Sequence, residues 1–229
     1  DLAYSGTGGV IINKGLMNIS NSYFNDSTLE ITHTYRAGGC IYNSGTINIE
    51  NTTMNKTSGS KMRGGAIFND GELNITRSAI IDSSAYDEGG AIFNDGTANI
   101  NTVLFEKCSG TYGIVTDREN KTTTIYNSSF IDCSIGSDHE YPSRYLGMIL
   151  NKGNMVVNRN IIDFRHYTPE DSSGTYGIYN IGNIIITHNL FLNTTTYAVD
   201  RWGKVLRNIQ IYIMNEGGSA NIDNNYFES

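Results

Sequence analysis

Short apolar segments alternate with turn residues along the whole chain and recur in a fixed order. The segment 64–80, GGAIFNDGELNITRSAI, returns almost unchanged at 89–105 as GGAIFNDGTANINTVLF. Each copy holds three apolar pieces separated by glycine, asparagine and aspartate, residues that tolerate the positive φ of a tight corner. None of the pieces has a 3.6-residue period, so the pattern predicts short strands and disfavours helices.

Three columns of equivalent residues extend this repeat over the whole chain. The residue before each turn is an asparagine or, once, an aspartate: Asn13, Asn43, Asn69, Asn94, Asp117, Asn151, Asn180 and Asn215. A β-branched residue follows each turn: Ile19, Ile49, Ile75, Ile100, Ile125, Val157, Ile186 and Ile222. A large apolar residue comes five positions later: Phe24, Met54, Ile80, Phe105, Phe130, Ile162, Phe191 and Phe227. The columns predict eight units with a fixed core spacing and loops of variable length.

Three short strands, three corners and roughly 25 residues per unit are typical of one coil of a parallel β-helix. We therefore predict an all-β fold, a right-handed parallel β-helix of about eight coils, with coils about 4.8 Å apart. The repeat has no break, so residues 1–229 are expected to form a single domain. Stacking should place the asparagines before the turns in a ladder of side-chain amides. Neither end has the pattern of a cap, and we expect a piece of a longer surface protein.

The first strand of each unit is apolar at all three positions, so one apolar set must point outward. The middle column is β-branched and is predicted to point inward. The outward set is then Ile12, Tyr42, Phe68, Phe93, Leu150, Tyr179 and Met214. A register shifted by one residue would instead leave a stripe of isoleucines outside. Either face is expected to dock against another part of the full-length protein, a second copy or the sugars of a partner, with Tyr42, Phe68, Phe93 and Tyr179 as candidate contacts.

Composition narrows the classes of function. The chain has 229 residues, a net charge of −7 and a pI near 5.0, which disfavours nucleic acid as a partner. It has no apolar run of the roughly 18 residues that a membrane span needs. Of the three cysteines, Cys108 and Cys133 fall in a column with Ser27, Thr57 and Ser83 and are predicted to be neighbouring reduced thiols.

The densest group of charged side chains lies on two long loops, 135–146 and 165–175. It comprises Asp138, His139, Glu140, Arg144, Arg165, His166, Glu170 and Asp171. Both loops leave the same corner of neighbouring units, so they are expected to lie side by side. They are either solvated, salt-bridged loops or a recognition patch, and a hydrolase built on Asp138, Glu140 and Glu170 is a further alternative. No set of residues has metal-ligand spacing, and we expect no metal and no cofactor.

Several asparagines lie in Asn-X-Ser/Thr sequons. Asn18 and Asn74 belong to the outward column of the second strand, so they are the candidate glycosylation sites. Sequons also arise by chance in a chain this rich in asparagine and threonine.

The strings GGAIFNDGELNI and GGAIFNDGTANI resemble the repeats of adhesin-like surface proteins of methanogenic archaea. More distantly, they are similar to the GGA(I/L) repeats of chlamydial polymorphic outer membrane proteins. The resemblance covers essentially the whole chain, although the Gly-Gly pair is lost in the last four units. It implies a β-helix at the cell surface or cell wall that presents loops to a partner, and it supplies no catalytic residue.

These observations predict an extracellular, cell-surface adhesin-like binding or stalk module rather than an enzyme. Its expected partner is a protein or glycan of another cell, with self-association through the apolar sheet face as an additional expectation. The alternative is a carbohydrate-active β-helix enzyme, either a polysaccharide lyase or a glycoside hydrolase.

Overall fold

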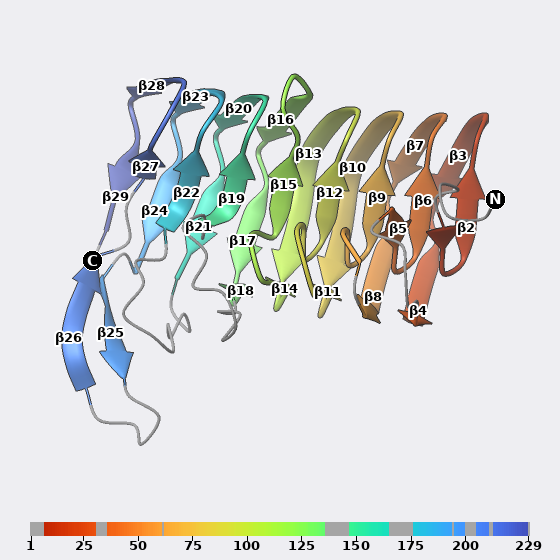
Figure 1. Ribbon diagram of the computed structural model, residues 1–229, viewed down its shortest axis with the longest axis horizontal. Helices are drawn as coiled ribbons and strands as arrows, with labels where there is room; N and C mark the ends of the chain where they lie inside the picture. Colours follow the sequence, from red (N-terminus) through yellow and green to blue (C-terminus); the bar gives the residue numbers. More distant parts are fainter. Residues whose placement is uncertain are drawn as a thin grey trace.

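A computed structural model describes residues 7–30, 36–60, 62–135, 147–164, 176–193, 195–199, 205–210 and 213–228. In these ranges the chain is an all-β parallel solenoid, and they contain no helix. Figure 1 looks onto one face of the solenoid, where successive short strands lie side by side. That face is a parallel sheet of β2 (Ile11–Asn13), β6 (Ile41–Asn43), β9 (Ile67–Asn69), β12 (Ile92–Asn94), β15 (Val115–Asp117), β19 (Gly147–Asn151), β22 (Tyr176–Asn180) and β27 (Ile213–Asn215).

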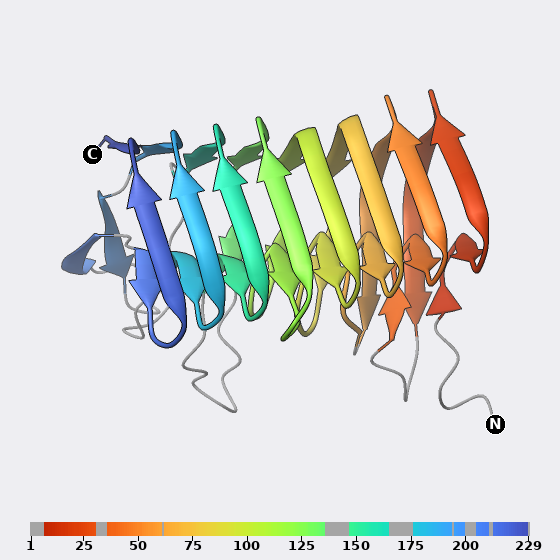
Figure 2. The same ribbon diagram turned by 90° about the horizontal axis from the view of Figure 1, so that it is seen from above.

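A second parallel column starts after the turn that follows each of these strands (Figure 2). It contains β3 (Leu16–Ser20), β7 (Thr46–Glu50), β10 (Glu72–Ile81), β13 (Thr97–Glu106), β16 (Thr122–Tyr126), β20 (Asn154–Asn158), β23 (Asn183–Thr187) and β28 (Ser219–Asp223). The ends of β10 and β13 continue into a third column with β4 (Tyr23–Glu30), β8 (Thr53–Ser60), β17 (Ser129–Ile131), β21 (Ile161–Asp163), β24 (Leu190–Leu192) and β29 (Tyr226–Phe227).

Three short strands extend the third column: β11 (Ser84–Ala85), β14 (Ser109–Gly110) and β18 (Ser134–Ile135). A separate parallel pair joins β1 (Thr7–Gly8) to β5 (Ala37–Gly38). An antiparallel pair joins β25 (Thr195–Val199) to β26 (Val205–Gln210).

The predicted columns are confirmed by the register of the strands. Ile67 pairs with Ile41 on one side and with Ile92 on the other. The asparagine ladder is formed as predicted, because the Nδ2 of Asn43 donates to the Oδ1 of Asn69 at 2.7 Å, and Asn69 donates to Asn94 at 2.7 Å. Each amide also donates to the backbone of the turn, so the ladder fixes the turn and the stacking together.

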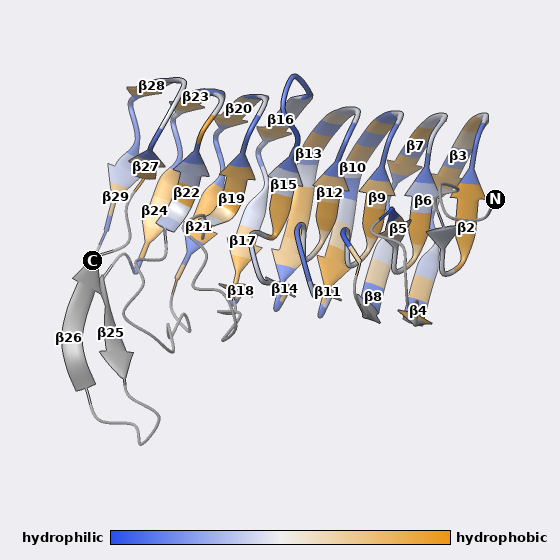
Figure 3. Ribbon diagram, viewed as in Figure 1, coloured by the Kyte–Doolittle hydropathy of each residue, from blue (hydrophilic) through white to orange (hydrophobic). Residues whose placement is uncertain are grey.

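The interior of the solenoid holds one continuous core. The middle residues of the first strands point into it, as predicted, together with the β-branched and large apolar columns, except that Ile222 and Phe227 in the last unit are 48% and 49% exposed. Phe105 and Phe130 stack with ring centroids 4.6 Å apart, close to the spacing of the strands that carry them. Hydropathy along the ribbon therefore alternates in bands across the strands (Figure 3).

The outward rings of the first strands are not accessible, contrary to the expectation of an open docking face. Tyr42, Phe68 and Phe93 are 5%, 1% and 0% exposed and form a small cluster of their own, outside the main core. Leu150 and Tyr179 are buried as well, whereas Ile12 is 49% exposed. The expected exposure is thus wrong from Tyr42 to Tyr179 within the described residues.

The chain approaches β9 and β12 closely at the glycines that precede these strands. Gly64 and Gly89 have φ of +79° and +70°, and a Cβ added to Gly89 would lie 2.5 Å from the carbonyl oxygen of Ile92. Only glycine lets the incoming chain lie so close to the strand that carries the ring. The Arg63 guanidinium then lies 5.1 Å from the centre of the Phe93 ring.

Cys108 and Cys133 are buried free thiols, and burial raises the pKa of Cys108 well above its ordinary value. Their thiols donate to the carbonyl oxygens of Ile80 and Phe105, which confirms their equivalent positions in neighbouring turns of the chain. They serve as small core residues, because a buried thiol is a poor nucleophile.

Candidate functional site

The candidate residues named from the two long loops lie outside the described residues. This applies to Asp138, His139, Glu140, Arg144, Arg165, His166, Glu170 and Asp171, so the recognition patch remains a prediction. Of the other candidates, Tyr42, Phe68, Phe93 and Tyr179 are buried by this chain itself.

The two candidate glycosylation sites differ in their surroundings. Asn18 is exposed at one end of an outer amide ladder, where its Oδ1 accepts from the Nδ2 of Asn48 at 2.8 Å. Asn74 is half-buried, and its Nδ2 donates both to the Oδ1 of Asn48 and to the carboxylate of Glu72. A glycan on that nitrogen would remove one donor, so the structure accommodates a glycan more readily at Asn18 than at Asn74.

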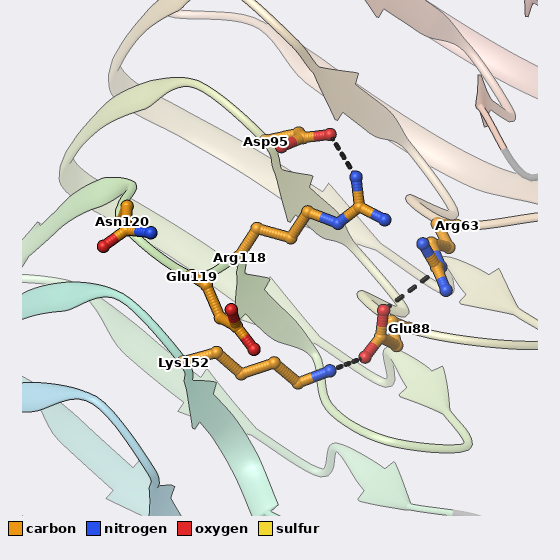
Figure 4. Close-up of a pocket in the computed structure, with 7 residues that line it drawn as sticks. All are labelled: Arg63, Glu88, Asp95, Arg118, Glu119, Asn120 and Lys152. Atoms are coloured by element: carbon orange, nitrogen blue, oxygen red, sulfur yellow. Dashed lines mark hydrogen bonds and ion pairs between the residues drawn. The ribbon is translucent and has the colours of Figure 1, made fainter. Parts of the chain in front are cut away.

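A charged pocket lies against the outer face of the eight-stranded sheet. It encloses about 500 Å³ and is lined by Arg63, Glu88, Asp95, Arg118, Glu119, Asn120 and Lys152. Figure 4 shows these side chains around the hollow, with Arg118 and Lys152 reaching across it from the ends of β15 and β19. Among the residues that the structure describes, the lining has three cations and three carboxylates and no apolar residue, so the pocket is suited to a polar ligand.

On one side of the pocket, Glu88 joins two cations. Its Oε2 lies 3.1 Å from the Nε of Arg63, and its Oε1 is bonded to the Nζ of Lys152. Arg63 also bonds Asp87 at 3.0 Å; the pKa of Asp87 is raised by its burial, and Arg63 opposes that rise. Both oxygens of the nearly buried Glu88 are therefore engaged, and the contact with Lys152 ties the chain before β12 to the chain after β19.

On the other side, Asp95 holds several cations. Its Oδ2 lies 2.8 Å from the Nη1 of Arg118 and 3.7 Å from Arg36, and its Oδ1 lies 3.7 Å from Lys121. Arg36 also pairs with Asp70, which accepts a hydrogen bond from the Tyr42 hydroxyl. Burial, and next the charge of Asp70, raise the pKa of Tyr42.

The pocket is found where the repeat departs from its pattern. Thr116 takes the position that Phe93 holds on the neighbouring strand, and Asp117 takes the position of Asn94. A longer turn then carries Arg118, Glu119 and Asn120 before β16 begins. A small side chain in place of a ring, with a longer turn beside it, leaves room on a face that is otherwise filled.

Asp117 is fully buried within the asparagine ladder. Its Oδ1 accepts the backbone N–H groups of Lys152 at 2.7 Å and Gly153 at 3.2 Å, while its Oδ2 has no hydrogen-bond partner among the described residues. Burial raises the pKa of Asp117 to about 7, against the opposing effect of those two N–H donors. Thr116 Oγ1 is likewise buried without a partner within the described part of the chain.

Sequence reasoning did not identify this pocket, although the signal was present. The sequence has a longer spacing from Asp117 to Ile125 than in the neighbouring units and loses the Gly-Gly pair, but neither feature reveals that Glu88 and Lys152, 64 positions apart, are in contact. In the described ranges, no group of three or more His, Cys, Asp or Glu side chains could hold a metal ion, and no helix there could cross a membrane.

Comparison with models of known protein families, with curated protein sequences and with solved structures finds no match for this chain.

Proposed function

We propose that this chain is a binding module of an extracellular, cell-surface adhesin-like protein, and that its charged pocket recognises a glycan. The observation that carries the proposal is the pocket itself: about 500 Å³ lined entirely by charged and amide side chains on the face of a rigid sheet. Such side chains suit the hydroxyl groups of a sugar, and the absence of apolar lining residues argues against a peptide held by apolar side chains.

The proposal includes the finer architecture of the solenoid. We propose eight coils, each starting with one strand of the eight-stranded sheet, and a right-handed path. The number of strands in that sheet supports the count, and the chirality of parallel crossovers favours the hand. Long stacked sheets of this kind display a site at a fixed position, which suits either an adhesin or a stalk.

Binding is favoured over hydrolysis by the state of the carboxylates. Glu88 and Asp95 have both oxygens in ion pairs, which leaves Glu119 as the one unpaired carboxylate among the described lining residues, whereas a glycosidase needs a pair of carboxyl groups that flank the bond it cleaves. The alternative hydrolase residues Asp138, Glu140 and Glu170 lie outside the described residues.

A glycan array probed with the 229-residue chain tests the proposal. We expect selective binding that Arg118→Gln lowers at least about tenfold, since Arg118 supplies charge-assisted hydrogen bonds inside the pocket. Arg77→Gln is the matched control, because Arg77 has the same charge, is exposed, pairs with Glu50 and does not line the pocket. Binding that ignores Arg118 would point to another surface, and release of reducing ends from a bound polysaccharide would favour the enzyme.

A further inference from the structure

We infer that the pocket selects a sugar bearing a carboxylate, an inference that rests on the proposed glycan-binding function and names the ligand class for that same site. Partners within the protein engage most hydrogen-bond acceptors of the pocket but leave several of its donors free. A pocket whose acceptors are occupied and whose donors are free fits a ligand rich in acceptors.

The acceptors are nearly exhausted. Both oxygens of Glu88 are taken by Arg63 and Lys152, and Asp95 is shared among Arg118, Arg36 and Lys121. The remaining carboxylate, Glu119, is exposed at the rim and has no ion-pair partner among the described residues.

Donors remain, by contrast, on the cations that cross the hollow. Arg118 bonds Asp95 through Nη1, and its Nε and Nη2 have no partner in the part of the chain that the structure describes. Lys152 donates to Glu88 through an ammonium group that carries three hydrogens. With Arg63, these side chains bring three positive charges to one pocket (Figure 4), an arrangement that an incoming anion would stabilise.

The charge balance favours a singly charged planar group. Among the described residues, three cations and three carboxylates line the pocket, so its net formal charge is zero, and a dianionic phosphate would bring twice the excess negative charge of a carboxylate. A carboxylate adds one negative charge and matches the planar fork of Arg118, which can bind it through two parallel hydrogen bonds. The volume of about 500 Å³ leaves room for the ring that carries the carboxylate.

A matched pair of probes tests the assignment: methyl β-glucuronide and methyl β-glucoside, which differ only in the carboxylate at C6. Titration of the isotopically labelled chain, followed by NMR at the backbone and arginine side-chain signals of the pocket, is expected to give a Kd on the order of 1 mM for the glucuronide. The glucoside should bind at least about tenfold more weakly.

Three variants sharpen the test. Arg118→Gln should weaken glucuronide binding by about tenfold or more, and Asp95 keeps Lys121 and Arg36 as partners, so the fold is expected to persist. Glu119→Gln should tighten binding by about threefold, because it removes an unpaired negative charge from the rim. Arg77→Gln is the control, and it should leave the affinity for the glucuronide unchanged because Arg77 does not line the pocket.

Equal affinity for both sugars, or no saturable shift of the pocket signals with either sugar up to about 10 mM, would overturn the inference. Tighter binding of methyl glucoside 6-sulfate than of the glucuronide would overturn the assignment to a carboxylate. The glycan array distinguishes failure of the acidic-sugar assignment from failure of the glycan-binding proposal. Selective, Arg118-dependent binding of neutral glycans would support glycan binding while contradicting the preference for a carboxylate.

Discussion

The asparagine ladder from Asn13 to Asn94 and the strand–turn segment around Asp117 are built on one plan and differ in how it is completed. In the regular part, each amide donates to the next amide and to its own turn, and aromatic rings fill the outer face of the sheet. At β15, an aspartate replaces the amide and Thr116 replaces the ring. The first region gains stability from repetition; the second gives up two of those interactions and gains a pocket, as functional sites commonly do.

Substitution of Asp117, at the ladder position of β15, is expected to change the free energy of unfolding most. Asp117→Asn restores an amide donor at a fully buried position, and we expect it to stabilise the protein by about 3 kcal/mol at pH 8. Since the pKa of Asp117 is raised from 3.8 to about 7 by folding, the folded state binds the extra proton. The stability that this proton contributes to the wild type is fully present below about pH 4 and is lost as the pH rises towards 7. The free energies of unfolding of the wild type and of Asp117→Asn are therefore expected to converge in acid.

Urea unfolding at pH 5 and pH 8 measures this difference. The reverse change in the regular ladder, Asn69→Asp, is the matched control, and it should destabilise the protein more at pH 8 than at pH 5. A pH profile that is identical for wild type and Asp117→Asn would show that Asp117 is not the titrating group.

Substitution of Gly89, which precedes the strand that carries Phe93, is expected to have a smaller effect on the free energy of unfolding. Gly89→Ala should destabilise the protein by about 2 kcal/mol, because a positive φ is costly for alanine and the new Cβ would lie 2.5 Å from the Ile92 carbonyl oxygen. Gly15→Ala is the control, since no atom lies within 4 Å of its added Cβ. Thermal unfolding of the two variants checks the contrast, and an equal loss in both would mean that the close packing at Gly89 does not limit stability.

The smallest effect is expected at a corner between the second and third columns of strands. Thr102 has φ of +56°, a conformation unfavourable for a β-branched residue, whereas asparagine occupies the equivalent corner at Asn21, Asn51, Asn127 and Asn224. Thr102→Asn should therefore stabilise the protein by about 0.5 kcal/mol. Asn51→Thr should have the opposite sign in the same denaturation assay, and a stabilising Asn51→Thr would contradict the argument.

Much of the fold could be predicted from the sequence because its information is local and repeated. The spacing from Asn69 to Ile75 and Ile80 recurs in six of the eight units, with longer turns in the fifth and the eighth, so it predicts the register, the ladder and the parallel pairing that the structure has. The inward direction of Ile67 and Ile92 followed from their β-branched column. These predictions needed no knowledge of distant contacts, since each residue stacks on its own equivalent.

Tertiary structure decided what covers the outer face and where a pocket opens. The sequence predicted that Phe68 and Phe93 point outward, but it did not predict that the chain itself buries them in a cluster with Tyr42. The pocket likewise depends on Arg63, Glu88 and Lys152, which come from separate turns of the chain, and on the raised pKa that burial gives Asp117. Periodicity fixes which residues stack on one another, whereas burial and charge pairing across a face depend on variable loops, whose paths the repeat does not specify.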